Sequence, residues 1–434
     1  MIGRDRPTVE AAHRPIHDVT ELTRTLPGLF PPDPLRVDLS WTSLDAQHIE
    51  TWVGSRLGLD WPAALLEAAQ VQPAGRSVHL PLAADTLVPA VDPRLRIELP
   101  ASRIKRRLGA AGSITPRVGR FYPQALVDGA RSLGAPRGHP LRVLECGKGR
   151  LSVDLNHPLA GRDLELTVTA GADRAAGGAG TGLSAELITG NGPGMQARRL
   201  QMGAPQPTDF FADRPFARMD PRPDSNFYAQ PRLVDHLDAT AIGVISTLYG
   251  SLMPRAGRIL DLMSSWHSHL PDALAPASVI GLGLNRAELE ANPVLTERLV
   301  QDLNQDPTLP IDDASIDGVV CTVSVEYLTR PFDVFRELGR VLRPGARICL
   351  TFSNRWFPPK VIAIWQELHE LERMGLVLAY LMESGLFTDL HTWSLRGLPR
   401  PADDKYASRL HFSDPVYAVW GRRCASVPYL NGDG

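Results

Sequence analysis

The sequence is poor in cysteine and has no excess of charge of either sign. Its 434 residues include 46 basic and 48 acidic residues, for a formal net charge of -2. A chain with so little net charge has no long-range attraction for nucleic acid or anionic lipid, so we expect partners of neither kind. The four cysteines, Cys146, Cys321, Cys349 and Cys424, have no C-x-x-C spacing, which argues against a zinc or redox site.

Long apolar runs are also missing. No stretch approaches the ~20 residues that cross a bilayer, and residues 1–22 lack the apolar segment of a secretory signal. We therefore expect a cytoplasmic protein without disulfides, in which Cys321 and Cys349, within apolar runs, belong to the core. The hydrophobic fraction of 43% is enough for sizeable cores, and the length suggests two or three domains of roughly 150 residues each.

The N-terminal half changes its pattern twice. Residues 1–93 are rich in Pro, Leu and Arg, with a helix-like pattern at residues 43–59, and their fold is unassigned. Residues 94–170 alternate polar and apolar positions, which predicts antiparallel β-strands with a hairpin turn at "CGKGR". Residues 171–208 are glycine-rich and poor in large apolar side chains, so we interpret them as a linker in which "LSAELITG" could form one short element.

Residues 209–424 predict a different architecture. A Pro- and aromatic-rich arm leads into an amphipathic helix from about Pro231, and another helix is expected at residues 331–342. Continuous Val/Ile/Leu runs, typical of strands buried on both faces, alternate with helical segments. They lie at residues 258–263, 278–284, 317–325 and 347–353, with a closing strand at 415–423. The pattern predicts an α/β fold with a Rossmann-like, doubly wound sheet.

In such a sheet, ligands bind beyond the carboxyl ends of the strands. Asp261 ends the first strand, and an acid there could hold an amino group. The glycines that usually follow are replaced by a turn containing Ser264, Ser265 and Ser268. These serines could supply hydroxyl groups to a ligand, or they could only cap the next helix.

The later strand ends carry weaker signals. Gly283 stands where an acid normally binds a ribose, and Asn285, two residues on, could take that role. Asp302, beside Leu303, could accept a hydrogen bond from an adenine amino group, or it could be a solvated loop residue. The fourth strand ends near Ser324, Glu326 and Tyr327.

Three stretches carry a resemblance to a known family: "DLMSSWHSH", "NPVLTE" and "VQDLN". They resemble the class I S-adenosylmethionine-dependent methyltransferases, of the methyltransferase type 11-like kind, in a branch that shares the D-L-x-S-S-W-x-S-H turn. The resemblance covers residues 209–424. It implies S-adenosylmethionine as cofactor, with the methionine part at Asp261 and the following turn, the ribose at Gly283, the adenine at Asp302 and the sulfonium beside Ser324. The full set of implied cofactor residues is Asp261, Ser264, Ser265, Trp266, Ser268, Gly283, Asn285, Asp302, Leu303 and Ser324.

The sequence departs from the general superfamily pattern in three places. It lacks Gly-x-Gly after Asp261 and the acid at Gly283, and it has Tyr327 where a His is frequent. Methyl transfer needs mainly positioning and the exclusion of water, with a general base only for a protonated nucleophile. The base is unassigned, and the candidates are His267, His269, Glu326 and Tyr327, with Asp235 and His236 as a lid. The His-x-His pair has no third ligand at useful spacing, so we expect no metal.

A second resemblance lies in the N-terminal half. The segment "DLNHPLAG", Asp154–Gly161, is similar to the closing segment of SlyD-type FKBP prolyl isomerases. The resemblance covers residues 94–170 and implies a β-rich FKBP-like domain, although Leu166 stands where that family often has Phe. It implies a chaperone-like or substrate-docking module rather than an efficient isomerase.

Together these features predict a methyltransferase that acts on a small molecule or a protein, with an FKBP-like module that recruits or protects a polypeptide client. The alternative is a chaperone or prolyl isomerase-like assembly factor with a degenerate methyltransferase domain. The sequence leaves open the methyl acceptor and the oligomeric state.

Overall fold

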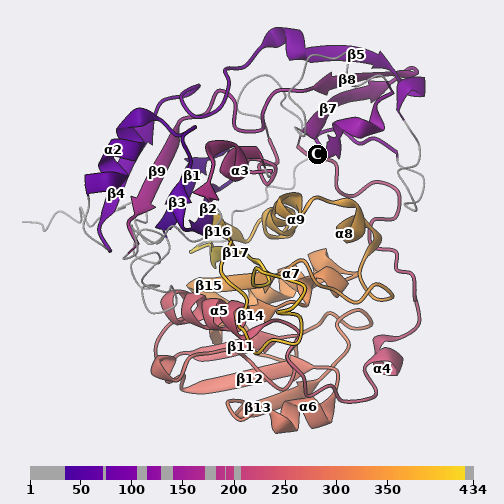
Figure 1. Cartoon of the computed structure of the whole chain (residues 1–434). Coiled ribbons are helices and arrows are strands. Elements are labelled where there is room, and N and C mark those ends of the chain that lie inside the picture. Colours follow the sequence, from indigo (N-terminus) through magenta and orange to yellow (C-terminus); the bar gives the residue numbers. More distant parts are fainter. Residues whose placement is uncertain are drawn as a thin grey trace, which may run out of the picture.

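One extended β-sheet runs through the molecule (Figure 1). The computed structural model describes residues 35–71, 75–104, 115–128, 140–171, 182–190, 192–199 and 207–425. Within these residues the sheet has 11 strands in the order β13-β12-β11-β14-β15-β17-β16-β2-β1-β9-β4. Both halves of the chain therefore contribute to it.

The C-terminal half forms the doubly wound part of the sheet. Its strands are β11 (Arg258–Leu262), β12 (Ser278–Gly283), β13 (Glu297–Val300), β14 (Ile316–Thr322), β15 (Leu342–Phe352), β16 (Phe387–Arg396) and β17 (Val416–Arg423). Numbered in chain order, these seven strands lie in the order 3-2-1-4-5-7-6, and only β17 runs antiparallel to its neighbours β15 and β16. The strand order reverses between β11 and β14. The predicted Rossmann-like sheet is confirmed.

Helices cover both faces of this sheet, which explains the continuous apolar strands. They are α4 (Asp224–Phe227), α5 (Ala239–Leu252), α6 (Arg286–Ala291), α7 (Pro331–Val341), α8 (Ala363–Glu367) and α9 (Glu370–Glu383). The apolar cluster on the α5 face contains Cys349, and the cluster on the α7 and α9 face contains Cys321. Both thiols are buried and free, as their apolar surroundings predict.

One helix begins later than predicted. The amphipathic pattern suggested a start near Pro231, but α5 begins at Ala239. Asp238 is its N-cap, and the Asp238 carboxylate accepts a hydrogen bond from the backbone N–H of Ala241 at 3.1 Å. Residues 228–238 instead form an irregular segment that reaches the candidate site.

The N-terminal half extends the sheet rather than standing apart from it. Its elements are β1 (Leu35–Thr42), β2 (Gln47–Gly54), β3 (Arg56–Leu57), α2 (Ala63–Val71), β4 (Ser77–Leu82), β9 (Leu164–Thr169), β10 (Gly182–Leu183) and α3 (Ala185–Gly190). The helix-like interpretation of residues 43–59 is wrong, because β2 pairs with β1 on one side and with β16 on the other. Because β2 is buried between two strands, its sequence does not show the polar–apolar alternation that is typical of a half-exposed strand.

A second, smaller sheet lies above α9 in Figure 1. It consists of β5 (Arg96–Pro100), β6 (Phe121–Pro123), β7 (Pro140–Gly147) and β8 (Arg150–Asp154), in the antiparallel order β5-β8-β7-β6. Lys148 and Gly149, both at positive φ, turn the β7–β8 hairpin as "CGKGR" predicted. The antiparallel strands predicted in residues 94–170 are therefore present.

The predicted boundaries do not coincide with the sheets. The boundary at residue 93 separates β4 from β9, which pair with each other. Part of the predicted linker, residues 171–208, is packed: Leu183 and Ile188 are buried. The Gln196 side-chain amide also donates to the Glu50 carboxylate at 2.5 Å. The glycine content predicted a flexible linker. Leu183, Ile188 and Gln196 are nevertheless packed, because they contact residues far away in the sequence.

Candidate functional site

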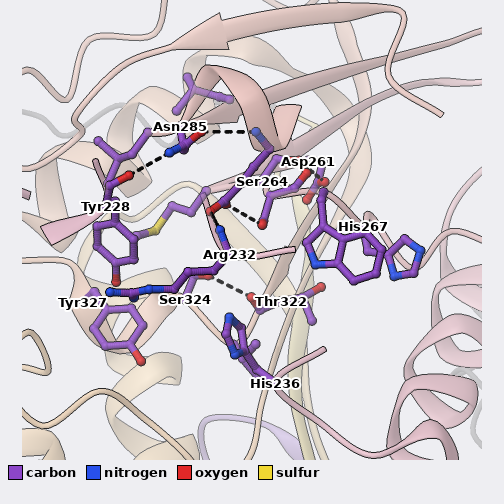
Figure 2. A pocket seen from close by; sticks show the side chains of 18 of the residues that line it. Tyr228, Arg232, His236, Asp261, Ser264, His267, Asn285, Thr322, Ser324 and Tyr327 are labelled. Atoms are coloured by element: carbon purple, nitrogen blue, oxygen red, sulfur yellow. Dashed lines mark hydrogen bonds between the residues drawn. The ribbon is translucent and has the colours of Figure 1, made fainter. Parts of the chain in front are cut away.

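A pocket opens at the carboxyl ends of β11, β12 and β14, where the strand order reverses (Figure 2). It holds roughly 1190 Å³ of atom-free space, its open mouth included. The structure brings most of the predicted site residues to its wall. They are Asp261, Ser264, Ser265, Trp266, His267, His269, Gly283, Asn285, Asp302, Leu303, Ser324 and Tyr327. Ser268 and Glu326 do not line it.

Two of the serines after β11, Ser264 and Ser268, bind Asp261. Asp261 is buried, and its Oδ2 accepts hydrogen bonds from Ser264 Oγ at 2.5 Å and Ser268 Oγ at 2.6 Å. Burial raises the pKa of Asp261 to about 6, while these two hydroxyl groups act to lower it. The hydroxyls therefore stabilise the carboxylate, which differs from the expectation that they replace backbone donors to a ligand.

Position 283 is glycine rather than an acid because no side chain fits there. The Ser264 N–H donates to the Leu282 carbonyl at 2.7 Å, so the turn crosses the end of β12. A Cβ atom on Gly283 would lie 2.2 Å from the Ser264 carbonyl oxygen, well inside contact distance. The departure at this position is thus a consequence of how the serine-rich turn is placed.

An acid does reach this edge of the pocket from α6. Glu288 is buried in the pocket wall and accepts hydrogen bonds from Ser265 Oγ at 2.6 Å and the Arg232 N–H at 2.7 Å. Asn285 caps α6, with its Oδ1 accepting from the Glu288 N–H at 3.2 Å, and its amide donates to the Tyr228 carbonyl at 2.8 Å. Sequence reasoning missed Glu288; the Asn-x-x-Glu spacing of a capping box is the signal that could have indicated it.

The remaining predicted cofactor residues also have partners of their own. Asp302 accepts from Gln305 Nε2 at 2.6 Å and from the Asn304 N–H at 3.0 Å. Leu303 is largely buried but contributes to the pocket wall. Ser324 Oγ donates to the Thr322 carbonyl at 2.8 Å. Asp302 is therefore held in place at the pocket, but its neighbours already use part of its hydrogen-bonding capacity.

The four candidate bases lie in different environments. His267 stacks on Trp266 with ring centroids 4.0 Å apart, and its Nδ1 is 3.2 Å from Asp235 Oδ1. Burial, with a smaller contribution from His267, lowers the pKa of His269 to about 4, so this ring is neutral at pH 7. The Tyr327 hydroxyl accepts from the Phe357 N–H at 2.9 Å, and burial raises the pKa of the phenol.

Glu326, one of the predicted candidate bases, does not line the pocket. Its side chain is fully buried away from the cavity, and neither carboxylate oxygen accepts a hydrogen bond from another described residue. Burial raises the pKa of Glu326 to about 8. The short 3-10 turn at Val325–Tyr327 directs Tyr327, not Glu326, toward the cavity.

The segment before α5 closes one side of the pocket. Tyr228, Arg232 and His236 all project into the region drawn in Figure 2. The guanidinium carbon of Arg232 lies 4.4 Å from the Phe227 ring centroid and 5.0 Å from that of Phe357. Sequence reasoning had placed only Asp235 and His236 here, because it assigned residues 231–238 to a helix.

The described residues contain neither a metal-binding cluster nor a membrane-spanning helix. In the ranges that the structure describes, no group of three or more His, Cys, Asp or Glu side chains could hold a metal ion. In the same ranges, no helix has both the length and the apolar character needed to span a membrane.

Part of the C-terminal half is similar to known methyltransferases. Residues 265–350 match a family model described as "Methyltransferase domain". The chain is 23% identical over 126 residues to a malonyl-[acyl-carrier protein] O-methyltransferase of Marinomonas sp., covering 29% of this chain and 44% of the relative. It is 29% identical over 118 residues to the ubiquinone/menaquinone biosynthesis C-methyltransferase UbiE of Bartonella quintana, covering 25% and 44%. The chain thus spans less than half the length of the curated relatives it matches.

Solved structures show further similarity. An S-adenosylmethionine-dependent methyltransferase from Mesorhizobium loti is 16% identical with a TM-score of 0.28, covering 39% of this chain and 92% of that chain. A SAM-dependent methyltransferase from Aquifex aeolicus is 14% identical with a TM-score of 0.27, covering 39% and 84%. Residues 265–350 lie within the doubly wound sheet, so the family match and the strand order agree on a methyltransferase domain in the C-terminal half.

Proposed function

We propose that the protein is an S-adenosylmethionine-dependent methyltransferase. The observation that carries this proposal is the position of Asp261, a buried acid at the end of β11 that opens onto a large pocket at the strand-order reversal. This is where doubly wound sheets bind their ligands. Because relatives of this chain include both an O- and a C-methyltransferase, the acceptor atom is not given by the family.

The pocket residues fit the chemistry of this cofactor. Asp261 would hold the ammonium group, and the edge formed by Gly283, Asn285 and Glu288 would face the ribose. Asp302 would accept a hydrogen bond from the adenine amino group. When bound, the cofactor supplies an activated methyl group on a sulfonium centre. The protein's residues then have to orient the acceptor in line with that methyl group and exclude water.

Isothermal titration with S-adenosylmethionine and S-adenosylhomocysteine tests the proposal. We expect wild-type protein to bind both, and Asp261→Ala to lose about 2–3 kcal/mol of binding free energy, roughly 30- to 150-fold in Kd, because a charge-assisted contact is removed. Asp272→Ala, at an exposed acid outside the pocket, is the matched control and should bind normally. Wild-type binding should also weaken from pH 7 to pH 5, because Asp261 becomes protonated near pH 6.

Unchanged affinity in Asp261→Ala would contradict the site assignment. Absence of binding by wild-type protein at millimolar ligand would favour the alternative, a chaperone or assembly factor with a degenerate methyltransferase domain.

For the N-terminal half we propose an FKBP-like docking module for a polypeptide. Its support is the "DLNHPLAG" segment and the arrangement of β1, β2, β4 and β9, with the smaller sheet inserted between β4 and β9 along the chain. The apolar face beside α2 is filled by the chain itself, since Leu183 and Ile188 pack in the cluster that contains Trp61. Trp61 Nε1 donates to the Leu183 carbonyl at 2.6 Å. A prolyl substrate would have to displace this segment.

A proline-limited peptide isomerisation assay tests this part. We expect the full chain to show no rate above the uncatalysed background, because Leu183 and Ile188 occupy the apolar face. Rapid catalysis would contradict the docking proposal and would make the N-terminal half an isomerase.

A further inference from the structure

Arg232 carries a buried hydrogen-bond donor that has no partner among the described residues. Its Nη1 is inaccessible to solvent and has no hydrogen-bond partner, and its Nη2 donates only to the Phe227 carbonyl at 3.3 Å. Among the described residues no carboxylate forms an ion pair with it. A buried cationic donor without a partner is energetically unfavourable. Arg232 also lines the pocket, which points to a ligand that accepts hydrogen bonds from the guanidinium.

The surrounding rings hold this guanidinium in one place. Its carbon lies 4.4, 5.0 and 5.6 Å from the ring centroids of Phe227, Phe357 and Tyr228. The Arg232 N–H is anchored to Glu288 at 2.7 Å, which holds the backbone. A planar guanidinium held in this way can donate a charge-assisted hydrogen bond to one carboxylate oxygen and leave the other oxygen free.

The guanidinium is directed to the side of the pocket opposite the serine-rich turn. Figure 2 shows the side chain of Arg232 extending toward Tyr228 and Tyr327 and away from Asp261 and His267. Tyr327 and Phe357 stack with ring centroids 6.1 Å apart, so this end of the pocket has flat apolar walls. It therefore suits a planar apolar body joined to one anionic group.

We propose that Arg232 binds the methyl acceptor, and that the acceptor is a small molecule with a carboxylate on a flat apolar body. This inference rests on the proposed methyltransferase function and specifies its substrate class. Arg232 holds one carboxylate oxygen, and the other oxygen faces the methyl donor.

The reaction balances without a general base. The free carboxylate oxygen uses a lone pair to form a bond to the methyl carbon, while the bond from that carbon to sulfur breaks and its electron pair stays on sulfur. The products are a methyl ester and S-adenosylhomocysteine, and no proton is released. The surroundings agree with this: burial raises the pKa of the phenols of Tyr228 and Tyr327, so both stay protonated, and Glu326 lies outside the pocket.

Titration of benzoate and benzamide into the full-length protein tests the inference, since the two probes differ only in charge and in one polar group. We expect benzoate to bind at least tenfold more tightly than benzamide, both with and without S-adenosylhomocysteine. Arg232→Gln should abolish this difference. Arg336→Gln, which changes an exposed arginine on α7, is the matched control and should keep it.

Three results would overturn the inference: equal affinity for the two probes in wild-type protein, a preference for benzoate that persists in Arg232→Gln, or a loss of S-adenosylhomocysteine binding of tenfold or more in Arg232→Gln. The last result would place the carboxylate of the cofactor, not that of the acceptor, on Arg232. Because the probe titrations are also run without S-adenosylhomocysteine, a failure of the proposed function remains distinguishable from a failure of this inference.

Discussion

Gly283 shows how one residue controls the candidate site. The turn that carries Ser264 passes directly over the end of β12, and the space for a Cβ atom is taken by a backbone carbonyl. Backbone atoms cannot move aside as a flexible side chain can. The missing acid at this position is therefore a packing requirement of the turn, and Glu288 reaches the same edge from α6 instead.

We predict that Gly283→Ala destabilises the protein and weakens S-adenosylhomocysteine binding, because the turn must shift to admit the methyl group. The expected loss of unfolding free energy is about 1–3 kcal/mol, as for overpacked cores, measured by urea denaturation. Gly147→Ala is the matched control, since a Cβ atom there meets nothing within 4 Å. Equal stability of the two variants would show that the turn is free to move.

Site residues could be predicted from the sequence only where the local pattern itself indicates a ligand. Asp261 was found because an acid at the end of a buried strand has few structural roles. Arg232 and Tyr228 were not found, because nothing in their local pattern indicates that an irregular segment crosses a pocket formed 30 to 130 residues later. The serines were predicted, but the hydroxyl groups of Ser264 and Ser268 bind Asp261 and that of Ser265 binds Glu288, which depends on the path of the turn.

Among the elements, α9 connects the two halves of the molecule. It packs against β16 and β17, and its Glu372 carboxylate accepts a hydrogen bond from the Phe121 N–H of β6 at 3.0 Å. Arg120 Nε lies 3.6 Å from the same carboxylate, and both side chains are buried. α9 is covered from both halves, and every residue from Leu371 to Leu381 is buried.

We predict that Glu372→Ala lowers the free energy of unfolding by about 2–3 kcal/mol, because it leaves the buried Phe121 N–H without its acceptor and removes one of the two carboxylates beside Arg120. Glu98→Ala, on β5, is the control, because it removes an ion pair with Arg150 in which both side chains are exposed. Its cost should be about 1 kcal/mol or less. Chemical denaturation of both variants measures the difference, and similar losses would mean that the Glu372 contact is weak.

Elements were predictable where the pattern was local. The strands β11, β12, β14, β15 and β17, the helix α7 and the β7–β8 turn all follow from apolar runs or turn residues. β2 was mistaken for a helix, and the start of α5 was placed too early. In both cases an amphipathic pattern suggested a helix. The contacts that decide the structure, the strand partners of β2 and the Asp238 cap of α5, are not visible in that pattern.

For the whole molecule, the junction between β2 and β16 is the central feature. Glu50 of β2 is fully buried there and accepts hydrogen bonds from Gln196 at 2.5 Å and from Ser394 and Arg396 of β16. Burial raises the pKa of Glu50 to about 7, although Arg396 and Gln196 act to lower it. The carboxyl group is therefore more easily protonated in the folded protein than in the unfolded chain.

This shift predicts how stability depends on pH. A raised folded-state pKa stabilises the fold fully below the unfolded value of 4.5, and this contribution is lost as pH rises through about 7. We predict that the free energy of unfolding of wild-type protein, relative to that of Glu50→Gln, falls by up to about 3 kcal/mol from pH 5 to pH 8. Glu98→Gln, at an exposed acid, is the control. Denaturation at four pH values measures the slopes, and identical slopes for Glu50→Gln and wild type would contradict the prediction.

The sequence by itself determined the class of the C-terminal half, because strands buried on both faces need continuous apolar runs and a Rossmann-like site needs an acid at a strand end. Only the tertiary structure decided that the N-terminal strands continue the same sheet, that Glu326 lies outside the pocket and that Arg232 lies within it. The physical reason is that strand pairing and pocket walls are contacts between distant residues. A local pattern records which side chains are buried, but not which partner buries them.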